Sequence, residues 1–289
     1  MVDHVGELCA RLGFQLISHL GSGAFKNAYR VAKDAQELVL KIAKQPGATA
    51  RDAREIESLR RCDHPGIARI IDSGSSTHEG VDYQYIVESF CGGESLGDIL
   101  RGGGRLSISQ IDRIAIRLID CLGYLESLRL VHRDIKPDNL ILNSSGDVTL
   151  IDFGLVRDLA NVSLTHSWVN MGPGTPFYAA PEQLTNQKAM IGWRTDQFSL
   201  GVTLCELLLQ FHPYQNINDL PRSPAIVERV ALRQPHGDCL FAHPSAEPFF
   251  QQMTHQWPVK RFASNGALIG AWENFMNQYP NEFLPSARP

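Results

Sequence analysis

The chain has 289 residues, of which 43% are hydrophobic and 20% are charged, and its formal net charge is −4. These proportions are those of an ordinary globular protein, and they exclude a fibrous or mainly disordered chain. The slightly acidic balance provides no overall basic field, so the sequence does not indicate nucleic acid as a partner.

Cysteine usage and the chain start bear on the cellular compartment. The six cysteines show neither a C-x-x-C pair nor metal-finger spacing, which favours reduced thiols and a cytoplasmic location. The N-terminus carries Asp3 and Glu7 and lacks the basic start and apolar core of a signal peptide. The longest apolar run, Phe198 to Phe211, is too short for a membrane span and predicts a buried helix.

The first part of the chain has the pattern of a small antiparallel sheet. Residues 14–42 alternate apolar and polar side chains around Gly21-Ser22-Gly23, which predicts a strand, a glycine turn and two further strands. Residues 49–61 have helical spacing, and residues 67–72 and 83–88 are two more strand candidates. Residues 1–13 are predicted as an extension that either forms a short helix against this sheet or is mobile.

Helical patterns dominate from residue 107 onward. Ser109 is predicted to cap a helix whose apolar positions recur at three- and four-residue steps from Ile111 to Leu125. Two short apolar runs, 140–142 and 148–151, predict a hairpin.

Two features of the first half could bind phosphate and a third could position one of them, and each is weak alone. Gly21-Ser22-Gly23 is either a simple turn or a loop whose backbone N–H groups approach phosphate oxygens. Lys41 closes an apolar strand and would place a positive charge there. Glu55, inside the predicted helix, is a candidate ion-pair partner for Lys41.

The strongest signal is the segment H-R-D-I-K-P-D-N at residues 132–139, followed by Asp152-Phe153-Gly154. Here the sequence resembles the protein kinase family, whose catalytic loop reads H-R-D-x-x-x-x-N and whose metal-binding turn reads D-F-G. Further matches arrive in the family's order, at residues 174–182, 196–201 and 258–261. Together they cover residues 14 to about 270.

The resemblance implies an α+β, bilobal protein kinase fold. A small antiparallel sheet lobe with one main helix would span residues 14–90, and a mainly α lobe would span residues 91–289. The implied activity is ATP-dependent phosphorylation of serine and threonine hydroxyls on proteins, autophosphorylation included.

By resemblance, Asp134 accepts the proton of the substrate hydroxyl and Lys136 neutralises the transferred phosphoryl group. Asn139 and Asp152 would bind Mg²⁺, or Mn²⁺ as an alternative, through hard oxygen ligands. Lys136 also carries the preference for serine and threonine over tyrosine.

The remaining nucleotide contacts are also implied by the resemblance. Val87 would be the gatekeeper, the backbones of Glu88 and Phe90 would bind the adenine edge, and Glu94 would reach the ribose. The full set expected to bind ATP is Leu20, Gly21, Ser22, Gly23, Ala24, Ala28, Val39, Lys41, Glu55, Val87, Glu88, Phe90, Glu94 and Ile141.

The activation segment would begin at Asp152-Phe153-Gly154, include Thr175, and end at Pro181-Glu182. Arg133, Asp196 and Arg261 would act structurally, with Arg261 paired to Glu182. Arg133 could also meet a phosphate on Ser163, Thr165 or Ser167, or these could be ordinary solvated hydroxyls.

One departure from the family pattern leaves alternatives open. Lys26 stands where the third loop glycine usually lies. It is the only feature that favours a pseudokinase, which would bind and scaffold without turnover, since Lys41, Asp134, Asn139 and Asp152 are all present. A small-molecule phosphotransferase of related fold is the second alternative, against which residues 174–182 and Arg261 argue. Protein substrates are the expected partners, and regulation is expected from this domain itself or from a protein partner.

Overall fold

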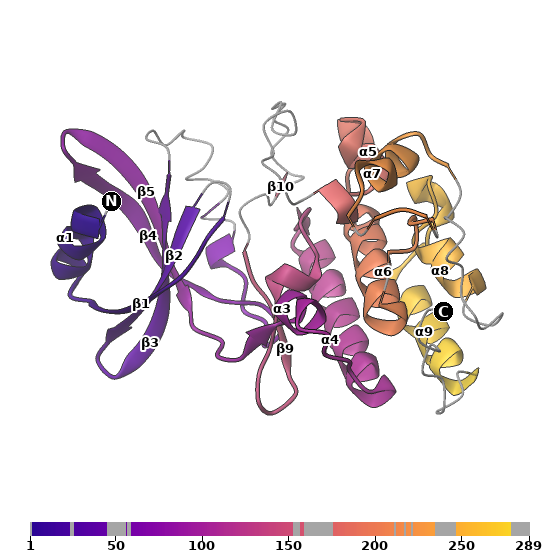
Figure 1. Cartoon of the computed structure of the whole chain (residues 1–289), viewed down its shortest axis with the longest axis horizontal. Coiled ribbons are helices and arrows are strands. Elements are labelled where there is room, and N and C mark those ends of the chain that lie inside the picture. Colours follow the sequence, from indigo (N-terminus) through magenta and orange to yellow (C-terminus); the bar gives the residue numbers. More distant parts are fainter. Residues whose placement is uncertain are drawn as a thin grey trace. The chain divides into compact units, whose positions relative to one another are not determined.

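The computed structural model describes residues 2–23, 26–44, 56, 59–152, 157–158, 176–210, 212–216, 218–220, 222–234 and 247–278. The chain divides into two compact units, Met1–Gly92 and Gly93–Pro289. Figure 1 shows a sheet-rich first unit and a mainly helical second unit, which confirms the predicted fold class.

The first unit is built on a five-stranded antiparallel sheet in the order β1-β2-β3-β5-β4. Its strands are β1 (Gln15–Ser22), β2 (Lys26–Lys33), β3 (Gln36–Ala43), β4 (Ile70–His78) and β5 (Val81–Ser89). Two-residue turns join β2 to β3 and β4 to β5. Asp34-Ala35 and Glu79-Gly80 all have positive φ, the conformation that matches the twist of hairpin strands.

Helix α1 (Val2–Leu12) covers one face of this sheet (Figure 1). Its buried residues Val5, Leu8 and Cys9 form one apolar cluster with sheet residues that include Leu40 and Val87. The N-terminal segment is therefore a docked helix, the first of the two alternatives that the sequence left open. Of the helix predicted at 49–61, only residues 56, 59, 60 and 61 are described.

The second unit contains most of the helices. They are α3 (Leu96–Arg101), α4 (Ile108–Ser127), α5 (Pro181–Leu184), α6 (Trp193–Leu209), α7 (Pro224–Ala231), α8 (Glu247–Met253) and α9 (Asn265–Gln278). Short strands form two small sheets, β6-β8-β9 and β10-β7. Their bounds are β6 (Glu94–Ser95), β7 (Leu130–Val131), β8 (Leu140–Leu142), β9 (Val148–Leu150) and β10 (Arg157–Asp158).

Helix α6 forms the centre of this unit and contacts α4 and α8. All its residues from Thr195 to Cys205 are buried, as predicted for the apolar run, and it ends at Gln210 in the left-handed conformation. Among the helices of the described ranges, none has the length and apolar character needed to cross a membrane.

The start of α4 differs from the prediction. Ser107, not Ser109, is the N-cap: its Oγ accepts from the backbone N of Gln110, and the Gln110 side chain accepts from the backbone N of Ser107. This reciprocal capping box satisfies two amide groups that have no partner within the helix. The capping box therefore identifies Ser107, and not Ser109, as the N-cap of α4.

Candidate active site

The loop at residues 132–139, here called the catalytic loop, follows β7 and leads through a 3₁₀ turn at Pro137–Asn139 into β8. The carboxylate of Asp196 on α6 holds its start, accepting from the backbone N–H groups of His132 and Arg133 at 2.7 Å each. Gln183 Nε2 donates to the carbonyl oxygen of Arg133 at 3.0 Å. Arg133 has a φ of 69°, so these bonds hold a backbone conformation that L-residues rarely adopt.

Asp134 lies at the centre of a short polar network. Lys136 Nζ contacts its two carboxylate oxygens at 3.0 and 2.8 Å. Asn139 Nδ2 donates to the carbonyl oxygen of Asp134 at 2.8 Å and to its Oδ2 at 2.9 Å. Burial raises the pKa of Asp134 to about 6, although the neighbouring Lys136 opposes the rise. The carboxyl group is thus mostly ionised at neutral pH and can accept a proton.

Asp152 follows β9. It lies close enough to Asp134 for its charge to contribute to the raised pKa of Asp134. The backbone N of Ile151 donates to the carbonyl oxygen of Asn139 at 2.9 Å, which ties the chain next to Asp152 to the catalytic loop. Asp152 has a φ of 66°. The expected residues Phe153, Gly154 and Thr175, and the candidates Ser163, Thr165 and Ser167, lie outside the described residues.

The donor set of this loop fits a hard divalent cation. The amide nitrogen of Asn139 is used in the two bonds to Asp134, so its amide oxygen is the atom that can ligate a metal. The carboxylate of Asp152 supplies a second kind of hard oxygen donor. Mg²⁺ binds through one or two such protein ligands and keeps water or phosphate oxygens elsewhere.

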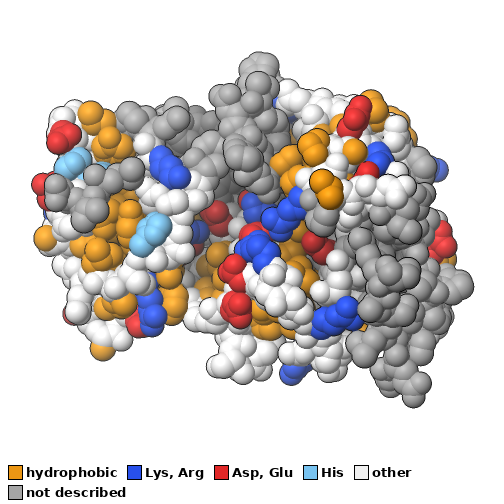
Figure 2. Space-filling model, in the orientation of Figure 1, with side chains coloured by type: hydrophobic (Ala, Val, Ile, Leu, Met, Phe, Trp, Pro, Cys, Tyr) orange, Lys and Arg blue, Asp and Glu red, His pale blue; other side chains and the backbone are white. Residues whose placement is uncertain are grey.

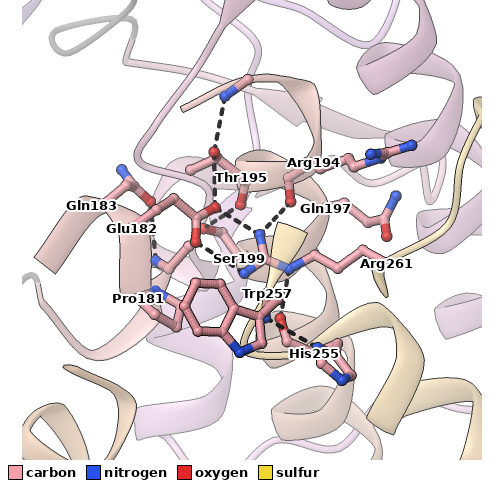
Figure 3. A network of polar contacts seen from close by, with 12 residues as sticks. Pro181, Glu182, Gln183, Arg194, Thr195, Gln197, Ser199, His255, Trp257 and Arg261 are labelled. Carbon is pink, nitrogen blue, oxygen red and sulfur yellow. Dashed lines mark hydrogen bonds and ion pairs between the residues drawn. The ribbon is translucent and has the colours of Figure 1, made fainter. Parts of the chain in front are cut away.

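Figure 3 shows the network around Glu182 and Arg261, the pair expected from the sequence. Arg261 binds both carboxylate oxygens of Glu182, at 2.7 and 3.0 Å, and the exposed fraction of both side chains is 0%. Thr195 Oγ1 also donates to Glu182, at 3.0 Å, and Arg261 donates to the carbonyl oxygens of Arg194 and His255. The bidentate pair links α5, α6 and the segment after α8.

In the first unit, Lys41 lies within β3, directly opposite Ala28 of β2 and Ile86 of β5. Directly opposite residues in an antiparallel sheet share a face, and so do alternate residues of one strand. Ala28, Val39 and Lys41 therefore lie on one face, as a nucleotide-facing surface requires. Gly21, opposite Ala28, lies on the same face.

Gly21 and Ser22 of the glycine loop are the last residues of β1, and Gly23 follows them. The backbone N of Gly23 donates to the carbonyl oxygen of Lys26 at 2.9 Å, and Ser22 Oγ donates to Asn27 Oδ1 at 2.8 Å. Lys26 is the first residue of β2. Leu20 is 46% exposed, and Ala24 lies outside the described residues.

The position of Val87 corrects the sequence interpretation. Its side chain is buried with α1, on the face opposite to Lys41, so it cannot be the gatekeeper facing the nucleotide. Glu88 is directly opposite Val39 and takes the Lys41 face instead. Its carboxylate forms an ion pair with Lys41, 2.8 Å from Nζ. Glu55, the partner expected for Lys41, lies outside the described residues.

Phe90, Glu94 and Ile141 are three further residues expected to contact ATP. The ring of Phe90 lies under the guanidinium group of Arg30, 4.4 Å from its centre. Glu94 is an exposed residue of β6, and Ile141 of β8 pairs with Ser95.

The surface drawn in Figure 2 carries side chains of both charge signs, often side by side.

Comparison with known proteins places these features in a family. The family profile described as "Protein kinase domain" matches residues 14–272. A probable serine/threonine-protein kinase of Streptomyces coelicolor is 29% identical over 237 residues, which cover 75% of this chain and 35% of that protein. Serine/threonine-protein kinase dst1 of Dictyostelium discoideum is 29% identical over 256 residues, 83% of this chain and 34% of that protein.

Human serine/threonine-protein kinase 10 is 30% identical over 217 residues, which cover 72% of this chain and 22% of that protein. The sheet-rich first unit, the mainly helical second unit and the loop that carries Asp134 agree with this family profile. The chain belongs to the protein kinase family. It spans about a third or less of the length of these relatives.

Two side chains that contact expected site residues were missed in the sequence. Gln183 braces the catalytic loop through Arg133, and the sequence offers no signal for it beyond its place next to Glu182. Glu88 was expected to contribute only its backbone. The contact of its side chain with Lys41 depends on the register between β3 and β5, which cannot be predicted from a single sequence.

Proposed function

We propose that this chain transfers the γ-phosphoryl group of ATP to serine and threonine hydroxyls of protein substrates, itself included. The observation that carries the proposal is the environment of Asp134. Its partly buried carboxylate is held by Lys136 and Asn139 on a loop anchored by Asp196. This arrangement suits a base that orients a hydroxyl group while a neighbouring ammonium meets the transferred phosphoryl group.

The chemistry assigns one task to each of these residues. Asp134 accepts the proton of the attacking hydroxyl, and Lys136 neutralises charge on the phosphoryl oxygens. Lys41 contacts the α and β phosphates. Asn139 and Asp152 hold the divalent cation, Mg²⁺ in the first place, which when bound offsets the negative charge of the nucleotide.

The experiment measures incorporation of radiolabelled phosphate from ATP into a generic basic protein and into the chain itself. Asp134→Asn should lower the rate at least about 1,000-fold, since it removes the proton acceptor. Asp138→Asn is the matched control, because Asp138 lies in the same loop but pairs with Arg101. It should keep most of the activity. Phosphoamino acid analysis should give phosphoserine and phosphothreonine.

Two outcomes would contradict the proposal. ATP binding without turnover would favour a pseudokinase scaffold, and transfer only to small molecules would favour a different phosphotransferase. We further propose a cytoplasmic location, supported by the thiols of Cys9, Cys62, Cys91, Cys121 and Cys205, which form no disulfide within the described ranges.

A further inference from the structure

The pairing of β3 with β5 brings an acidic residue, Glu88, to Lys41. Val39 is opposite Glu88, and Lys41 is opposite Ile86, so Lys41 and Glu88 are diagonal neighbours on one face of the sheet. Diagonal neighbours are within reach of long side chains. Both residues lie in the first unit, on two central strands, so their proximity follows from the sheet alone.

The contact between them is a buried ion pair. Lys41 Nζ is 2.8 Å from Glu88 Oε2, and the side chains are 8% and 5% exposed. The ion pair of Arg30 and Glu37 in the same sheet lies at the surface instead: its side chains are 35% and 42% exposed. A buried pair of this geometry holds both groups in place far more strongly than a surface pair.

A buried ammonium group depends on its counter-charge. Without a carboxylate nearby, a lysine in such a site releases its proton or turns toward solvent, because an unpaired buried charge is very costly. Either change would take the cation away from a phosphate. An ammonium group has three N–H donors, so a bond to Glu88 does not by itself prevent Lys41 from contacting a ligand.

We propose that Glu88 is a positioning residue, whose carboxylate fixes the Lys41 ammonium for the phosphates of the nucleotide. The assignment rests on the proposed function, because it takes Lys41 as the phosphate contact. It deepens that function by placing the counter-charge of Lys41 on strand β5 of the sheet itself. The gatekeeper position is then occupied by a carboxylate where the sequence suggested Val87.

The test compares the affinity for ADP with that for adenosine, by calorimetry at fixed magnesium concentration. Adenosine lacks the phosphates, so it reports on the base site alone. Glu88→Gln should weaken ADP binding roughly tenfold, the effect of about one charge-assisted hydrogen bond, and should change adenosine binding less than about twofold. In a Lys41→Met background the same substitution should have no further effect on ADP affinity.

Two further variants complete the design. Glu37→Gln removes a carboxylate from the same strand as Lys41 and should leave both affinities unchanged. If circular dichroism shows that Glu88→Gln does not fold, Glu88→Asp keeps the charge at shorter reach and should weaken ADP binding roughly threefold, again without affecting adenosine.

The contrary results distinguish a failure of the positioning role of Glu88 from a failure of the proposed function. Unchanged or tighter ADP binding by Glu88→Gln would overturn the positioning role, and so would equal losses for ADP and adenosine. None of these measurements requires phosphoryl transfer, so an inactive chain that binds ADP would contradict the proposed function alone. Absence of ADP binding by the unaltered chain would overturn both.

Discussion

At the residue scale, the ion pair between Glu182 and Arg261 is the most deeply buried charge contact that the described residues contain. Breaking a buried pair leaves one charge without compensation. Glu182→Gln should therefore lower the free energy of unfolding by about 3–5 kcal/mol, measured by urea denaturation.

The control for this substitution is Glu37→Gln, which breaks a partly exposed pair with Arg30. It should cost less than about 1 kcal/mol. Equal losses for the two variants would show that burial does not decide the contribution of these pairs.

Gly93 offers a second test at the scale of one residue. Its φ is 103°, and an added Cβ would lie 2.2 Å from the carbonyl oxygen of Leu142. Gly92 also has a positive φ, of 60°, but an added Cβ would meet no atom within 4 Å.

Gly93→Ala should cost more than about 3 kcal/mol of unfolding free energy, whereas Gly92→Ala should cost about 1–2 kcal/mol from backbone strain alone. Thermal denaturation of the two variants measures the difference. Similar midpoints would contradict the close approach at Leu142.

At the scale of single elements, helix α1 is attached to the sheet by apolar packing. Leu8 is 1% exposed within the cluster that includes Leu40 and Val87. Leu8→Ala should destabilise the chain by about 2–5 kcal/mol, because it removes buried contacts and leaves a cavity. Leu16→Ala, at a position 42% exposed on β1, should cost under about 0.5 kcal/mol in the same denaturation experiment.

The same helix carries a titratable contact. The ring of His4 stacks on that of His78 at 4.6 Å, and Glu7 binds His78. Burial, followed by the charge of His78, lowers the pKa of His4 below 6.5, although Glu7 opposes the shift and Arg11 adds to it.

Because the folded state favours neutral His4, its contribution to stability is complete above pH 6.5 and is lost as the pH falls below that value. Amide hydrogen exchange in α1, corrected for intrinsic rates, should therefore show weaker protection at pH 5.5 than at pH 7.5. His4→Phe keeps an aromatic ring without titration and should reduce this difference. The same pH dependence in that variant would assign the effect to another group.

At the scale of the whole molecule, each unit has its own apolar cluster. One joins α1 to the first sheet, and the other surrounds Phe198 and Tyr214 in the second unit. We therefore expect Leu8→Ala to weaken amide protection mainly in β3 and β5, and Glu182→Gln to weaken it mainly in α5 and α6. Native-state hydrogen exchange measures both patterns. Uniform losses over both units in either variant would mean that they unfold as one cooperative body.

Much of the chain could be read from local patterns. Catalytic-loop residues Asp134 and Asn139 are close in sequence, and the resemblance of their segment to the kinase catalytic loop implied a shared site. The contacts within the loop agree with it. The strands of the first sheet follow from alternation, because a strand repeats every two residues, and the buried helix α6 follows from its long apolar run.

Tertiary structure decided what depends on pairing between distant segments. A strand that slips by one residue turns every side chain to the other face. For this reason the sequence alone could not show that Val87 packs under α1 while Glu88 meets Lys41. The bond from Gln183 to Arg133 likewise joins segments far apart in the chain. The sequence thus specified the chemistry of the catalytic loop, whereas strand register specified the charge environment of Lys41.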